Sequence, residues 1–156
     1  QGAFAQDTKI GVINALQALF NSDSARVMQE ALDQEFGADT TRAQGLNDEL
    51  TALAEKFQQD EAVMTDQEKS RMNSQAQDLQ VQLQLIQERL QKVSQERNQL
   101  YLESMRGPLA AAVTDVVAEG GYDLILNVDS APYFAPVLDI TAKVTAKLNE
   151  QAKLAE

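Results

Sequence analysis

Apolar residues recur with a regular spacing through the middle of the chain. One run places them at alternating steps of three and four, with one polar position, at Ala43, Leu46, Leu50, Leu53, Phe57, Asp60 and Met64. A second run is apolar at eight of its ten positions, which are Met72, Ala76, Leu79, Leu83, Ile86, Leu90, Val93, Arg97, Leu100 and Ser104. A period of about 3.5 residues sustained in this way is typical of a coiled coil. Each run therefore predicts a long helix.

A short polar break separates the two predicted helices, because residues 64–69 interrupt the spacing. Thr65, with Glu68 three residues later, can cap a new helix. Asp66 with Lys69 is the alternative start. A helix that restarts so soon folds back on the first one. The simplest product is an antiparallel hairpin whose limbs have about 30 to 40 residues, or about 45 to 60 Å at the α-helical rise.

The hairpin is expected to span residues 36–107. Gly107 and Pro108 close it, because proline is poorly tolerated inside a helix but fits the first turn of a new one. Arg97 places a charge on the apolar seam. It either pairs with a carboxylate of the first limb, which would fix the register of the hairpin, or marks where the limbs separate.

Strands are predicted only towards the two ends of the chain. Residues 9–14 form a short β-branched run, and residues 122–128 form a second one. A weaker third strand is expected around residues 133–135. Pro132 and Pro136 flank that segment, which favours an edge position in the sheet.

Shorter helices are predicted beside these strands. One begins near Asn14 or at the polar residues 21–24, where Ser24 or Asp23 can cap it, and Gly37 interrupts or bends it. Gly120 and Gly121 end another helix that begins after Pro108. Asp139 is expected to cap a closing helix that has one apolar face, formed by Ile140, Val144 and Leu148.

Because the predicted strands all lie towards the two ends of the chain, we expect these ends to form one discontinuous α+β body, residues 9–35 and 108–155. A body of about 75 residues with three strands has a marginal core and exposed sheet edges. Association between copies would cover those edges. The expected oligomer core is Ile10, Val12, Ile13, Leu124, Ile125 and Leu126.

Composition excludes several kinds of active site, because the chain has no Cys, His or Trp. It cannot form a Cys- or His-ligated zinc site, a Cys nucleophile or a Ser-His-Asp triad. Four aspartates near the body are the remaining acid–base candidates, namely Asp115, Asp123, Asp129 and Asp139. Such residues more often cap helices and turns. We therefore expect no catalytic, cofactor or metal site, and no enzyme.

The formal net charge of −11 disfavours binding to nucleic acid, whose phosphates carry the same sign. No apolar run approaches the roughly 18 residues needed to span a bilayer, so no stable membrane insertion is expected. The absence of Cys fits an oxidising compartment. Residues 1–8 are interpreted as a signal remnant or a disordered N-terminus, because Ala3-Phe4-Ala5 has an A-x-A-like pattern. An arbitrary terminus is the alternative.

Several segments together resemble the Skp/OmpH family of periplasmic chaperones. They are residues 9–14 (KIGVIN), 32–36 (LDQEF), 122–126 (YDLIL), Tyr133 and 139–141 (DIT), and their order covers essentially the whole chain. The resemblance implies a jellyfish-shaped homotrimer in the periplasm. Its β bodies would hold together three helical hairpins around a central cavity.

The resemblance also implies that the protein binds unfolded outer-membrane proteins in that cavity without ATP. The best-known members are basic, whereas residues 36–107 carry 12 acidic and 8 basic side chains. Binding of lipopolysaccharide and electrostatic capture of clients are therefore not carried over to this chain.

The candidate client contacts lie near the predicted tip of the hairpin. They are Phe57, Val63, Met64 and Met72, because methionine adapts to partners of varied shape. Phe57 and Met72 also lie on the seam, so packing within the hairpin is the competing interpretation. The alternative function is a structural coiled-coil spacer that recognises one folded partner. Binding to several unfolded membrane proteins would distinguish a holdase from a spacer.

Overall fold

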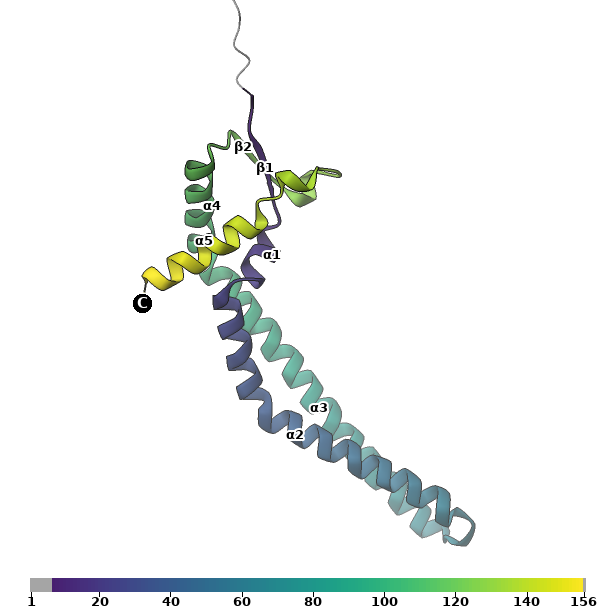
Figure 1. Ribbon diagram of the computed structural model, residues 1–156. Helices are drawn as coiled ribbons and strands as arrows, with labels where there is room; N and C mark the ends of the chain where they lie inside the picture. The colour runs from purple at the N-terminus through teal and green to yellow at the C-terminus, as the bar shows by residue number, and fades with distance from the viewer. Residues whose placement is uncertain (1–6, 156) are drawn as a thin grey trace, which may run out of the picture. The chain divides into compact units, whose positions relative to one another are not determined.

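The computed structural model describes residues 7–155 (Figure 1). The expected cleavage pattern at Ala3-Phe4-Ala5 lies outside these residues. The chain divides into two compact units, Gln1–Glu30 with Asn98–Glu156 (the terminal unit) and Ala31–Arg97 (the hairpin unit). The main elements in chain order are β1 (Ile10–Ile13), α1 (Ala15–Phe20), α2 (Asp23–Asp60), α3 (Asp66–Ser104), α4 (Arg106–Gly120), β2 (Leu124–Asn127) and α5 (Thr141–Leu154). Long helices with a small β part confirm the predicted α+β class.

The sheet of the terminal unit has two parallel strands, with Ile10 opposite Leu124 and Ile13 opposite Asn127. The expected third strand is wrong, because residues 131–135 contain no strand. That segment lies between two 3₁₀ turns, Val128–Ser130 and Pro136–Leu138. Prolines in and beside it lack the N–H group that a ladder requires. Pairing resumes only at a single bridge between Val12 and Asp139.

The strands approach the core closely at Gly11. A Cβ atom on this residue would lie 2.8 Å from Cδ1 of Ile125 and 3.1 Å from Cγ2 of Ile140. Helix α5 packs against α1 and α4. Its predicted apolar face is confirmed, since all three members are buried: Ile140, Val144 and Leu148.

Both predicted starts of the first helix exist, as two separate helices. The side chain of Asn14 accepts a hydrogen bond from the backbone N of Gln17 at 3.0 Å and caps α1. Helix α2 follows, and the Ser22 hydroxyl accepts from the N of Ala25 at 3.3 Å. The cap of α2 is therefore Ser22, not Ser24 or Asp23. Gly37 does not interrupt the helix, because one glycine costs only about 1 kcal/mol.

The end of α3 departs from the predicted seam. Leu100, expected on the seam, is 59% exposed, whereas the neighbouring Tyr101 is only 8% exposed. The Tyr101 ring packs beside Phe20, with centroids 5.7 Å apart, and belongs to the core of the terminal unit. The last turns of α3 thus face that core and no longer follow the coiled-coil period. Helix α4 then begins at Arg106 and holds Pro108 in its first turn, as predicted.

Candidate functional site

The two limbs of the hairpin unit pack through the predicted seam. Leu46 of α2 and Leu79 and Ile86 of α3 are buried in one cluster. Four partly buried residues surround them, Ala43, Leu50, Leu83 and Leu90. These contacts confirm the seam for this part of the hairpin, where α2 and α3 run side by side in Figure 1.

Three arginine side chains link the two limbs through polar contacts. Nη2 of Arg97 lies 3.1 Å from Oε2 of Glu35, and Nη1 of Arg89 lies 3.1 Å from Oδ2 of Asp39. Arg42 donates to Gln82 at 2.7 Å. The partners advance along α2 as they recede along α3, which is the register of an antiparallel pair. Of the two interpretations of Arg97, the structure therefore contains the ion pair with the first limb.

The tip of the hairpin is closed by a reciprocal cap. A 3₁₀ turn, Glu61–Val63, ends the first limb. Oε2 of Glu68 accepts from the backbone N of Thr65 at 2.8 Å, while the Thr65 hydroxyl accepts from the N of Glu68 at 3.2 Å. These hydrogen bonds lower the pKa of Glu68 below its ordinary value, because they favour the charged carboxylate. Of the two predicted starts, Thr65 with Glu68 is the one formed.

Between the buried seam and the tip, the limbs leave a first open groove of about 530 Å³. Its apolar lining comes from both helices: Leu50, Leu53, Ala54, Phe57, Met72 and Ala76. Phe57 and Met72 are only half-buried, although both lie on the seam. The seam is thus closed around Leu46 and Leu79 but open near the tip.

A second groove of about 550 Å³ lies at the tip itself. Its apolar residues are Leu53, Val63, Met64 and Met72, and charged side chains of both signs line it as well, namely Lys56, Asp60, Glu68 and Arg71. Val63 is 82% exposed, whereas Met64 is half-buried. Met72 lines both grooves, so the structure brings the four predicted contact residues to two grooves that share one wall.

The grooves also contain residues that the spacing of apolar positions does not single out as contacts. Lys56 and Glu68 face the second groove but lie off the apolar seam. Leu50 and Leu53 are on the seam and were assigned to packing alone. The spacing does not predict that they line a groove beside Phe57. It indicates which residues share a face of a helix but not how far apart two helices lie. Chemically, the grooves offer adaptable apolar walls beside charges of both signs, which suits an extended apolar segment with polar neighbours.

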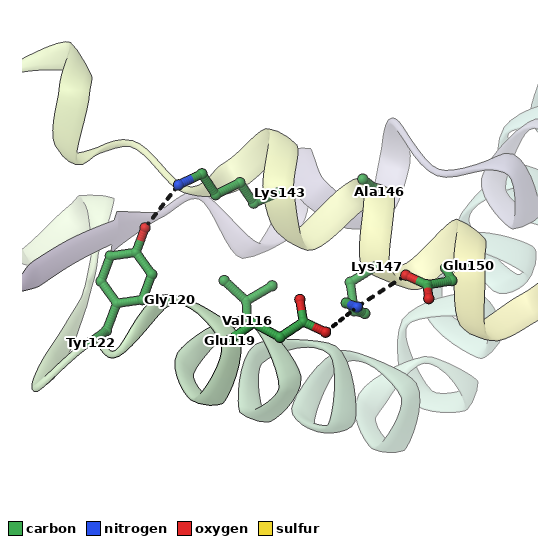
Figure 2. Close-up of a pocket in the computed structure, with 8 residues that line it drawn as sticks. All are labelled: Val116, Glu119, Gly120, Tyr122, Lys143, Ala146, Lys147 and Glu150. Carbon is green, nitrogen blue, oxygen red and sulfur yellow. Dashed lines mark hydrogen bonds and ion pairs between the residues drawn. The ribbon is translucent and has the colours of Figure 1, made fainter.

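The terminal unit holds a separate open hollow of about 390 Å³ between α4 and α5, shown in Figure 2. Its charged groups pair with one another. Lys147 Nζ lies 2.6 Å from Oε1 of Glu119 and 3.0 Å from Oε2 of Glu150, which raises the pKa of Lys147 above its ordinary value. Lys143 donates to the Tyr122 hydroxyl at 3.1 Å. The charged side chains that line this hollow therefore already have partners within the terminal unit.

The expected oligomer core is divided between covered and exposed positions. Val12 and Ile13 are buried within their own chain. Ile10, Ile125 and Leu126 are half-buried, and Leu124 is 46% exposed. Leu16 and Phe20 of α1 are also exposed, and they line an open groove with Val128.

The carboxylates of three of the four acid–base candidates accept hydrogen bonds from backbone or side-chain N–H groups. Asp123 accepts from the N of Lys9 at 2.7 Å, Asp139 from the N of Thr141 at 2.9 Å, and Asp115 from Gln151 at 3.0 Å. Asp129 lies in the 3₁₀ turn after β2. Within residues 7–155, no acidic cluster has the arrangement of a metal site. Nor does any helix in that range combine the length and apolar character needed to cross a membrane.

Comparison with known proteins agrees with this architecture. The family described as "Outer membrane protein (OmpH-like)" matches residues 9–148. The Chaperone protein Skp of Yersinia enterocolitica is 25% identical over 145 residues, which cover 91% of this chain and 87% of that protein. A Skp-like protein of Pseudomonas aeruginosa is 28% identical over 152 residues, with 95% and 88% covered.

The fold is also found in a solved structure. An OmpH-like protein of Caulobacter crescentus superposes with a TM-score of 0.53 at 17% identity, covering 97% of this chain and 90% of that one. The family match spans most of the chain, from β1 into α5. The chain therefore belongs to the OmpH-like family, to which the Skp chaperones also belong.

Proposed function

We propose that this protein is an ATP-independent holdase chaperone of the periplasm that keeps unfolded outer-membrane proteins from aggregating. Membership of a chaperone family supports a chaperone role. The observation that carries the finer proposal is the pair of open grooves near the hairpin tip, where apolar side chains of both limbs stay partly uncovered.

The grooves suit a client that has no fixed shape. An unfolded chain presents isolated apolar side chains between polar ones, and each can enter a groove without the client adopting a fold. Leu53, Met64 and Met72 offer flexible apolar walls for such contacts. Contacts of this kind are individually weak and exchange readily, so the client is held without being locked in one conformation.

The proposed assembly is a homotrimer in which the body of residues 9–35 and 108–155 joins the copies and the arm of residues 36–107 contacts the client. Within the described residues, the outer edge of β2 has no strand beside it, and the outer edge of β1 carries only the single bridge between Val12 and Asp139. Exposed apolar residues lie on the same body, among them Leu16, Phe20 and Leu124. Covering these groups would give each copy the core that its own two strands do not supply.

The test is suppression of client aggregation by the full chain, followed by light scattering after unfolded outer-membrane proteins are diluted from denaturant. The substitutions Val63→Ser and Met64→Ser together should weaken suppression. Leu154→Ser is the matched control, because Leu154 is as exposed as Val63, at 82%, but lies in the terminal unit. Equal activity of both variants would remove the tip from the mechanism. Binding to one folded partner only would favour the spacer.

A further inference from the structure

We propose that Met64 and Met72 form an oxidisable pair through which peroxide switches off the client grooves. The effect on clients depends on the proposed holdase function, whereas the selective oxidation does not. The chain has four methionines, and the structure separates them into two sets. Met28 and Met105 pack against the core of the terminal unit, and Met64 and Met72 line the grooves.

All four methionine side chains are half-buried, and the two sets differ in what surrounds them. Met28 and Met105 lie against a continuous cluster of buried apolar residues, and the Ser24 hydroxyl points at Sδ of Met105 at 3.9 Å. Met64 and Met72 belong to neither of the two buried clusters of the described chain. They line grooves that open to solvent, so a small oxidant can approach them without the helices separating.

The reaction needs only a peroxide of the hydrogen peroxide class. A lone pair on the methionine sulfur attacks one peroxide oxygen and forms an S–O bond, while the O–O bond breaks and the second oxygen leaves as water after proton transfer. The sulfur loses two electrons and the peroxide gains them, giving methionine sulfoxide. Enzymatic reduction of the sulfoxide reverses the change.

The position of Met72 makes its oxidation costly to both grooves. A sulfoxide converts a flexible apolar side chain into a polar one that accepts hydrogen bonds. Met72 is the only methionine that lines both grooves, and Leu53 of the other limb lines both as well. Its sulfoxide would therefore place a polar oxygen on the shared apolar wall, and the Met64 sulfoxide would do the same at the tip. Apolar client segments would then lose the surface that they contact.

The order of oxidation can be measured directly on the full chain. Trypsin places the four methionines on four different peptides, because a Lys or Arg separates each from the next. After brief treatment with hydrogen peroxide, mass spectrometry should find one added oxygen on the Met64 and Met72 peptides several-fold faster than on the Met28 and Met105 peptides. In denaturant the four rates should become similar. Equal rates in the folded chain would overturn the proposal.

The effect on clients is tested with the same samples. Peroxide should remove roughly half or more of the aggregation suppression, and sulfoxide reductases should restore it. The Met28→Leu and Met105→Leu double variant should lose activity on oxidation as the parent does. In the Met64→Leu and Met72→Leu double variant, activity after peroxide should equal its own activity before. If that variant is inactivated as strongly as the parent, the switch is refuted. If the untreated parent suppresses no aggregation, the holdase function fails while the oxidation order stands on its own.

Discussion

The Tyr101 hydroxyl donates a hydrogen bond to the backbone carbonyl oxygen of Leu19 at 2.9 Å, although 82 positions separate the two residues in the chain. The same hydroxyl lies 2.9 Å from the Ser22 side chain, which caps α2. One buried phenol therefore joins the end of α1, the start of α2 and the last turns of α3 within the terminal unit.

Replacing this phenol tests how much the network stabilises the fold. Tyr101→Phe should keep the ring packed beside Phe20 but remove the donor, and should lower the free energy of unfolding by about 1 to 2 kcal/mol. Tyr133→Phe removes a hydroxyl from a side chain that is 87% exposed and should leave stability within about 0.5 kcal/mol of the parent. Urea unfolding at constant protein concentration measures both. Similar losses from the two variants would refute this role of the network.

The Tyr101 network was not predictable from the sequence for a physical reason. The period of the seam continues through Leu100, but periodicity says nothing about where a helix leaves one packing partner and turns its inward face to another. The same limit applies to Phe57 and Met72. Their positions on the seam were correctly read, yet the open grooves depend on how closely the limbs approach.

Other parts of the fold were predictable because local chemistry decides them. Thr65 and Glu68 have the spacing of a capping box, and the structure forms its reciprocal hydrogen bonds. Ile140, Val144 and Leu148 share a face by helical period alone. The prediction of a third strand was wrong, because the β-favouring residues beside Pro132 and Pro136 do not compensate for the N–H donors that the prolines lack.

Two glycines with different surroundings give a second prediction. Gly11→Ala should lower the free energy of unfolding by about 1 to 3 kcal/mol, because the new methyl group would meet Ile125 at 2.8 Å. Gly45→Ala should raise it by about 0.5 to 1 kcal/mol, because Gly45 lies inside α2 and its Cβ position has no neighbour within 4 Å. Denaturant unfolding measures both signs. A stabilising Gly11→Ala substitution would contradict the close packing of β1.

The capping box predicts a pH dependence at the hairpin tip. The folded pKa of Glu68 is lowered by its hydrogen bonds with Thr65, so the ionised carboxylate stabilises the folded tip. This contribution is complete above the ordinary pKa of 4.5 and is lost as the pH falls through the lower folded value. Thr65→Ala removes the hydroxyl but keeps the backbone N–H that is the larger cause, so an NMR titration should show the pKa of Glu68 rising only part of the way towards 4.5. An unchanged pKa in that variant would mean that the Thr65 hydroxyl does not contribute to the lowered value.

The seam and the ion pairs between the limbs should contribute unequally to the hairpin. Leu79→Ala removes a buried side chain from the cluster with Leu46 and should cost about 2 to 4 kcal/mol in the free energy of unfolding. Arg97→Gln breaks a contact whose partners are 51% and 38% exposed, so its cost should stay below about 1 kcal/mol and shrink in high salt. Leu85→Ala, an exposed position on the same helix as Leu79, is the control for the loss of a leucine and should change stability by about 0.5 kcal/mol or less.

Amide hydrogen exchange of α2 and α3, measured together with the unfolding curves, shows which part of the hairpin each substitution destabilises. Leu79→Ala should speed amide exchange along both limbs, because it leaves a cavity in the buried cluster that holds α2 and α3 together. Arg97→Gln should leave exchange around Leu46 and Leu79 unchanged. If Arg97→Gln cost as much as Leu79→Ala, the limbs would be held together chiefly by charge. The apolar packing around Leu46 would then hold the limbs together no more strongly than the open grooves near the tip do.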